Sequence, residues 1–253
     1  SAVTRTIEVI FGLCALYRGR FVEARACFDK ALPLARSLGD VHVARADEVY
    51  RAECLIFEGR YGEADAELSR LCAEPLPPST RAAALARRAF LLALLVVDHP
   101  DAFRAAHQAI HAGPDVPFLR AWDRLYLAWS RVLRGAWSEA DMLLAPAESY
   151  FRSGGLKPAV SLAACIRAES LLFAGKADHA FRVLDGVDDA SDLVEALRSL
   201  AAARLCLERG PPETAMTRSS DLLAHAGASM AGNPLHEWGL RARALRQAIL
   251  GAS

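Results

Sequence analysis

A six-residue motif that begins with glycine and ends with alanine recurs along this chain at a nearly constant interval. The motif begins at Gly19, Gly59, Gly135, Gly175 and Gly210. The segment 98–102 fills the one remaining place, although it lacks the glycine. The closing alanines are separated by 40, 38, 38, 40 and 35 residues, and they are Ala24, Ala64, Ala102, Ala140, Ala180 and Ala215. Such a period is typical of repeat proteins, in which each repeat is one supersecondary unit.

The motif predicts a helical hairpin. Glycine ends one helix where left-handed backbone geometry is often needed, and a small alanine early in the next helix lets two helix axes approach closely. Apolar residues follow the alanine after four and seven positions, as with Phe28 and Ala31, and this spacing gives one apolar helical face. A second helical stretch precedes each glycine, at about 6–18, 43–58, 81–97, 118–134, 159–174 and 193–209.

Clusters of glycine, proline and aspartate separate the hairpins and indicate the joints between repeats. The predicted repeats span about 3–38, 41–74, 79–113, 117–153, 157–187 and 190–227, with a capping helix at about 234–250. Pro33 and Pro146 fall inside predicted second helices and are expected to kink or shorten them. We therefore expect a single all-α domain, a right-handed α-solenoid of about six hairpins with a C-terminal capping helix.

The motif Gly-x-aromatic-x-Glu-Ala, with Gly12 seven residues before Gly19, resembles the tetratricopeptide repeat (TPR) across nearly the whole chain. The first, second and fourth repeats match best. The interval exceeds the usual 34 residues of that repeat, so the closer resemblance is to the longer-helix variety of maltose-activator-type bacterial regulators. This resemblance implies a scaffold whose first helices line a concave binding surface.

Composition narrows the classes of function. The 30 basic and 30 acidic residues cancel, which disfavours direct nucleic-acid binding, and 53% hydrophobic content favours a folded core. The six cysteines show no C-x-x-C pair, and neither a signal peptide nor a membrane-spanning run is apparent, so we expect a cytoplasmic protein. The arginine and alanine bias is associated with bacterial coding. The first residue is not methionine, so an excised part of a larger protein is one expectation.

No local motif predicts chemistry. His107 and His111 lie four residues apart near His99, but no H-E-x-x-H pattern accompanies them, so an ordinary polar pair is favoured over a metal site. The glycine-rich segment 153–158 follows no strand and lacks a phosphate-loop pattern, so a connector is favoured over a nucleotide site. We therefore expect no catalytic residues, no cofactor and no metal.

The candidate binding residues come from the predicted first helices. Large rings recur at helical spacing in the segment 118–129, and charges fall where each first helix should face the concave groove. The predicted groove residues are Glu53, Arg87, Trp122, Tyr126, Trp129, Glu169 and Arg204. The alternative is that the rings belong to the core and that the charges are solvated or paired.

Two functional hypotheses follow. The first is a non-catalytic scaffold that recognises a protein segment, a peptide or a small effector within a bacterial transcriptional or signalling regulator. The second is an enzyme or biosynthetic accessory protein with a small-molecule pocket in the groove around Trp122, Tyr126, Trp129 and Arg87. Neither a nucleic-acid nor a membrane partner is expected. The sequence leaves the oligomeric state and the identity of the ligand open.

Overall fold

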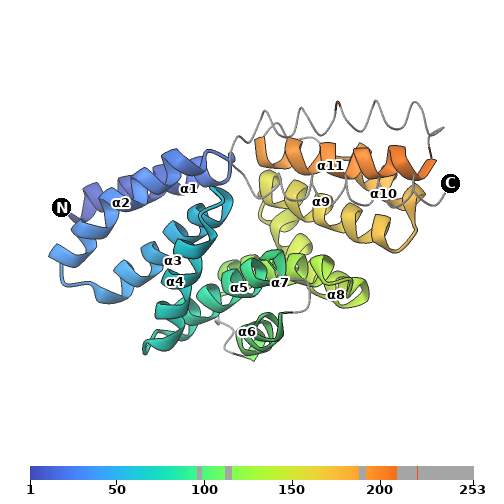
Figure 1. Cartoon of the computed structure of the whole chain (residues 1–253). Coiled ribbons are helices and arrows are strands. Elements are labelled where there is room, and N and C mark those ends of the chain that lie inside the picture. Colours follow the sequence, from blue (N-terminus) through green and yellow to red (C-terminus); the bar gives the residue numbers. More distant parts are fainter. Residues whose placement is uncertain (96–98, 112–115, 188–191, 210–220, 222–253) are drawn as a thin grey trace.

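The computed structural model shows an all-α protein and describes residues 1–95, 99–111, 116–187, 192–209 and 221. Its helices pack sequentially as antiparallel hairpins (Figure 1). They are α1 (Ala2–Leu16), α2 (Phe21–Ser37), α3 (Val41–Phe57), α4 (Tyr61–Ala73), α5 (Pro78–Leu95), α6 (Pro100–His111), α7 (Pro117–Leu133), α8 (Trp137–Ser153), α9 (Lys157–Phe173), α10 (Ala177–Asp185) and α11 (Asp192–Arg209). This arrangement is consistent with a helical solenoid.

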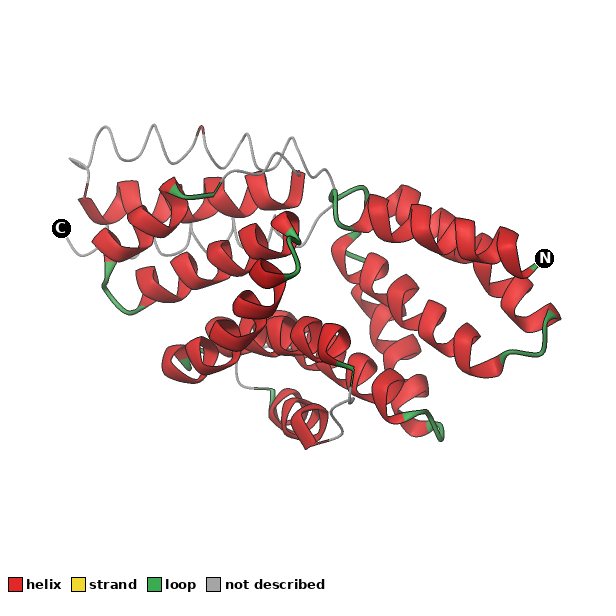
Figure 2. Cartoon of the chain, turned by 180° about the vertical axis from the view of Figure 1, so that it is seen from behind, coloured by secondary structure: helices red, strands yellow, loops and turns green. Residues whose placement is uncertain are grey.

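The predicted first helices are α1, α3, α5, α7, α9 and α11, and each begins one to four residues earlier than predicted. The difference has local causes. Asp40 caps α3 by accepting a hydrogen bond from the Val43 amide at 3.0 Å. Pro78 and Pro117 begin α5 and α7, since proline is tolerated in the first helical turn. Figure 2 shows the successive hairpins following one curved path.

The repeated motif forms the predicted hairpin corner. Gly19, Gly59, Gly135 and Gly175 all have left-handed backbone geometry, with φ between 69° and 76°. In each case the next residue donates a backbone hydrogen bond to a carbonyl five residues earlier, as Arg60 does to Leu55 at 2.9 Å. The closing alanines are completely buried at Ala24, Ala64, Ala102, Ala140 and Ala180. The register of the first five hairpins is therefore confirmed.

Pro33 and Pro146 were expected to kink or shorten their helices, and they do not shorten them. Helix α2 continues through Pro33 to Ser37, and α8 continues through Pro146 to Ser153. Each proline removes one backbone donor, but packing beyond it holds the helix together. Ala35 is buried after Pro33, and Phe151 is buried after Pro146.

The second helix of the sixth hairpin, with Ala215, and the capping helix at 234–250 were predicted in segments that lie outside the described residues. All six cysteines lie within the described residues and are free thiols, with Cys54 and Cys165 buried. Among the described helices, none combines the length and apolar character needed to cross a membrane.

Candidate functional site

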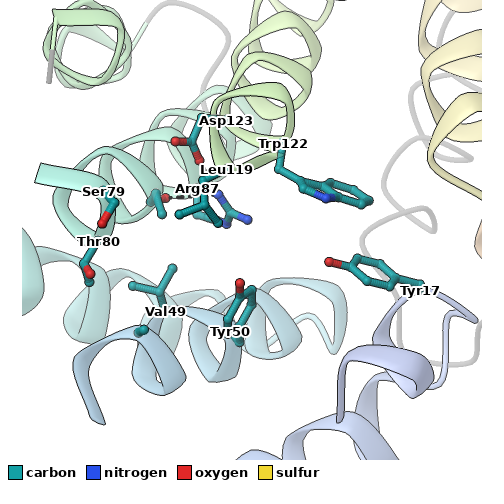
Figure 3. A pocket seen from close by; sticks show the side chains of 11 residues that line it. Tyr17, Val49, Tyr50, Ser79, Thr80, Arg87, Leu119, Trp122 and Asp123 are labelled. Carbon is teal, nitrogen blue, oxygen red and sulfur yellow. Dashed lines mark hydrogen bonds and ion pairs between the residues drawn. The ribbon is translucent and has the colours of Figure 1, made fainter. Parts of the chain in front are cut away.

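A cavity of about 140 Å³ lies where four first helices converge, and Figure 3 shows the side chains that surround it. Tyr17 follows the end of α1, and the other lining residues come from α3, α5 and α7. The lining is mostly apolar and aromatic, with a few polar groups, which is the usual character of a ligand site. The residues of this concave cavity are Tyr17, Ala46, Val49, Tyr50, Ser79, Thr80, Ala83, Arg87, Leu119, Trp122 and Asp123.

The repeat register explains why successive helices contribute to one cavity. Val49 and Arg87 each lie fifteen residues before the closing alanine of their own hairpin. Equivalent positions of stacked hairpins face the same side of a solenoid, so the two side chains border the same space. The sequence places an apolar side chain at one of these positions and a guanidinium at the next.

A buried charged cluster forms the floor of the site. Arg87 donates from Nε to Glu53 Oε2 at 2.9 Å and from Nη1 to Asp123 Oδ1 at 2.8 Å. The hydroxyl of Tyr126 donates to Glu53 Oε1, and the Arg87 guanidinium lies 4.5 Å from the centre of the Tyr126 ring. The exposed fractions of Glu53, Arg87 and Asp123 are 2%, 4% and 5%. The cluster thus joins α3, α5 and α7 through charge-assisted hydrogen bonds.

Burial changes the protonation behaviour of this cluster. It raises the pKa of the Asp123 carboxyl to about 6, although Arg87 opposes the rise. Burial lowers the pKa of Arg87, but the carboxylates of Glu53 and Asp123 outweigh it and the net change is upward. Burial also raises the pKa of Tyr126 well above its usual range, and Glu53 adds to the rise. Near neutral pH, Arg87 is charged, Tyr126 is neutral and Asp123 is mostly ionised.

Two residues that line the cavity each have a buried polar atom with no hydrogen-bond partner among the described residues. The two atoms are Oδ2 of Asp123 and Nε1 of Trp122, whose side chain is buried with 7% exposed. One is an acceptor and the other is a donor. Leaving such groups unpaired in a buried site is unfavourable, so a bound molecule that satisfies them is stabilised there.

The rings of Tyr17 and Trp122 stack across the site, with centroids 4.7 Å apart and planes inclined by 10°. Tyr17 directly follows α1 and Trp122 belongs to α7, so the two rings lie far apart in the sequence. Both rings also border a second cavity of about 20 Å³, which Glu53 and Tyr126 help to line. The stacked pair therefore adjoins both spaces, and the second space is too small for more than about one water molecule.

The structure brings together four of the predicted groove residues, namely Glu53, Arg87, Trp122 and Tyr126. Trp129 lies in the core beside them, with its ring centroid 4.6 Å from that of Phe90 and 6.4 Å from that of Tyr126, and it borders neither cavity.

Glu169 is buried on α9 and is absent from the lining of both cavities. Arg204 belongs to α11, and its side chain is outside the described part of the structure.

Sequence reasoning missed Asp123, Tyr17 and Tyr50. Asp123 had a usable signal, since it is an acidic residue within the aromatic segment 118–129, where an unpaired buried charge would be costly. Tyr17 and Tyr50 had no comparable signal, because their roles depend on how successive hairpins curve toward one another. Periodicity along one helix does not specify that curvature.

The sequence also singled out the pair His107 and His111 and the glycine-rich segment 153–158. His107 and His111 are exposed neighbours with their Nε2 atoms 3.2 Å apart. Within the described residues, no group of three or more His, Cys, Asp or Glu side chains has a metal-binding arrangement. The glycine-rich segment joins α8 to α9, with Gly155 at a φ of 68°.

Comparison with known proteins does not assign a family to this chain. No family model matches the chain, and no curated protein is significantly similar to it in sequence. The architecture, a series of stacked antiparallel helices consistent with a helical repeat, is therefore described without a family.

Proposed function

We propose that this protein is a non-catalytic binding module of the TPR-like, longer-helix type, which binds a small effector in its concave cavity. The module would belong to a cytoplasmic regulatory protein of a bacterium. Effector binding would change the conformation of the solenoid. The observation that carries this proposal is the cavity itself, which four first helices enclose above a buried cluster of charges.

The size of the cavity favours a small effector over an extended peptide. A cavity of about 140 Å³ is close to the roughly 150 Å³ known to hold a benzene-sized molecule. It is well below the roughly 300–1,000 Å³ of pockets that enclose drug-sized ligands. A peptide could place at most one side chain in this space.

The position of the cavity suits regulation. Its lining comes from α1, α3, α5 and α7, so a ligand would contact parts of four hairpins at once. A ligand can shift a conformational equilibrium only if it binds one conformation better than another. Contacts that depend on the relative placement of four hairpins meet this requirement, since they are lost when the solenoid opens.

Nuclear magnetic resonance of the tryptophan indole groups tests this proposal. The Trp122 signal, assigned with Trp122→Phe, is followed while a panel of benzene-sized fragments is added. We expect several fragments to shift it. Ala83→Leu fills the cavity and should abolish the shifts, whereas Ala26→Leu, on the exposed face of α2, should preserve them. A Trp122 signal that no fragment moves, or that still moves in Ala83→Leu, contradicts the proposal.

A further inference from the structure

We propose that the ligand of the concave cavity is a small organic cation, a protonated amine carried on a flat apolar body. This inference rests on the proposed function and specifies the chemistry of its ligand. Three observations carry it: an unpaired buried carboxylate oxygen, an excess of negative charge, and a lining of aromatic rings.

The carboxylate of Asp123 is only half satisfied. Its Oδ1 accepts from Arg87, while its Oδ2 is buried without a partner among the described residues. Arg87 also donates a hydrogen bond to Glu53 Oε2, and Glu53 Oε1 accepts one from the Tyr126 hydroxyl. An ammonium group supplies up to three donors, so it can satisfy Asp123 Oδ2 and also reach a neighbouring hydroxyl. The hydroxyls of Ser79 and Thr80 border the same cavity.

The charges around the cavity favour a cation. Arg87 from α5 and Asp123 from α7 line the cavity, and Glu53 from α3 pairs with Arg87 from outside the lining. The two carboxylates share one guanidinium, so the cluster of three residues carries one negative charge in excess. Tyr17 and Tyr50 stay neutral, because burial raises the pKa of both phenols. A ligand with one positive charge balances the site, whereas an anion would add a further charge to a buried group that is already negative.

The neighbouring groups distinguish the two sides of Asp123. This residue also borders a cavity of about 400 Å³ toward α6 and α8, where Arg120 and Arg124 contribute to the lining. A cation entering there would meet two further positive charges. On the concave side, the side chains of Tyr17, Tyr50 and Trp122 border the space instead. Aromatic rings attract cations through their negative faces, so the concave side is the favoured one.

The size of the space limits the rest of the molecule. A cavity of about 140 Å³ holds one benzene-sized ring or a short alkyl chain beside the ammonium group. The unpaired Nε1 of Trp122 adds one preference, since it can donate to a hydroxyl or carbonyl oxygen of the ligand. Benzylamine has the required ring and charge and serves as the probe.

Three probes of similar shape test the charge preference on the unmodified protein, with calorimetry and the Trp122 indole signal as readouts near neutral pH. Benzylamine is cationic, benzyl alcohol is neutral and benzoate is anionic. We expect benzylamine to bind at least about tenfold more tightly than benzyl alcohol, and benzoate to bind most weakly. Asp123→Asn should reduce benzylamine affinity to that of the alcohol, whereas Asp141→Asn, at an exposed pair on α8, should leave it unchanged.

The outcomes separate this inference from the proposed function. Benzylamine and benzyl alcohol binding equally well would overturn the cation preference and leave the cavity as a binding site. The same conclusion follows if Asp123→Asn remains folded and binds benzylamine as well as the unmodified protein does. If none of the three probes, nor any fragment of the panel, moves the Trp122 signal, the proposed function fails as well. The comparison among probes needs no variant, so it holds even if Asp123→Asn does not fold.

Discussion

Two buried carboxylates in this protein are satisfied to different degrees. Glu48 on α3 accepts from Arg36, Arg45 and Arg70, at 2.8, 2.9 and 2.8 Å, and so connects α2, α3 and α4. Asp123 shares one arginine with another acid. Burial raises the pKa of Glu48, but the three arginines outweigh it and the net change is downward. For Asp123, burial prevails and raises the pKa. Glu48 therefore stabilises the packing of three helices, and Asp123 is a candidate for binding a ligand.

Replacing Glu48 should destabilise the protein in a pH-dependent way. Glu48→Gln removes the charge that three arginines bind, and we expect a loss of about 2 kcal/mol of unfolding free energy near neutral pH. Because the folded-state pKa is depressed, this contribution is present above the ordinary value of 4.5 and is lost as the pH falls through the folded-state value. Urea denaturation as a function of pH measures it. Glu63→Gln, at an exposed ion pair with Arg60, is the control. Equal losses of unfolding free energy in the two variants would contradict the structural role of Glu48.

Asp123 should give the unmodified protein the opposite pH dependence, and Asp123→Asn should remove it. The folded-state pKa of about 6 exceeds the ordinary value of 3.8, so the folded protein binds the extra proton and its stability falls as the pH rises between these values. The difference corresponds to about 3 kcal/mol, at about 1.4 kcal/mol for each pKa unit. Asn does not titrate, so the unfolding free energy of the unmodified protein, relative to that of Asp123→Asn, should fall by this amount as the pH rises over that range. Parallel stability curves would show that Asp123 titrates normally.

At the scale of the element, one register places equivalent residues of successive hairpins. The closing alanine is buried at each described corner. The position thirteen residues before it is buried in α5 and α7, at Ala89 and Leu127, and is a partly buried arginine in α3 and α9. The same position in α1 is Phe11, which is 60% exposed beside exposed Ile7 and Ile10. Helices α5 and α7 thus bury an apolar side chain at this position, whereas α1 leaves one exposed in the described structure.

Enlarging a closing alanine should destabilise the protein. Ala64 and Ala140 are completely buried where two helices approach closely. Ala64→Leu and Ala140→Leu overpack this contact and should each lower the unfolding free energy by about 1–3 kcal/mol. Thermal melts measure the effect, with the exposed Ala26→Leu as the matched control. Unchanged melting temperatures in both core variants would show that the helices are paired in another register.

Equivalent positions in α1 and α7 should respond differently to truncation. Leu127→Ala removes a buried side chain and should lower the unfolding free energy by about 2–5 kcal/mol. Phe11→Ala removes an exposed ring and should change it by less than about 0.5 kcal/mol. Denaturant titration of the two variants gives both numbers. A loss at Phe11 as large as that at Leu127 would show that α1 is covered in solution.

The sequence predicted elements better than it predicted the site. Gly59 and Ala64 identify a hairpin corner because backbone geometry and close helix packing restrict those positions to small residues. The long first helices follow from their apolar periodicity. The pairing of Arg87 with Asp123 does not follow from this periodicity, because it depends on the distance between two hairpins. For the same reason Trp129, which shares its repeat position with Glu53, lies in the core while Glu53 reaches the charged cluster.

At the scale of the whole molecule, curvature creates the candidate site. The hairpins follow a curved path (Figure 1). Tyr17, which directly follows α1, stacks on Trp122 of α7 (Figure 3). A straight stack of the same hairpins would keep these rings apart. The cavity, the charged cluster and the aromatic stack therefore depend on one global shape, and a ligand that fills the cavity should stabilise that shape.

A crystal structure of the protein with benzylamine, prepared near neutral pH, tests the central claim most directly. The claim is that four first helices enclose a cavity for a small cation. We expect the amine nitrogen within hydrogen-bond distance, about 3 Å, of Asp123 Oδ2, and the ring beside Tyr17 and Trp122. An amine bound only elsewhere would contradict the claim. So would a structure in which Arg87 occupies the cavity and Tyr17 lies apart from Trp122.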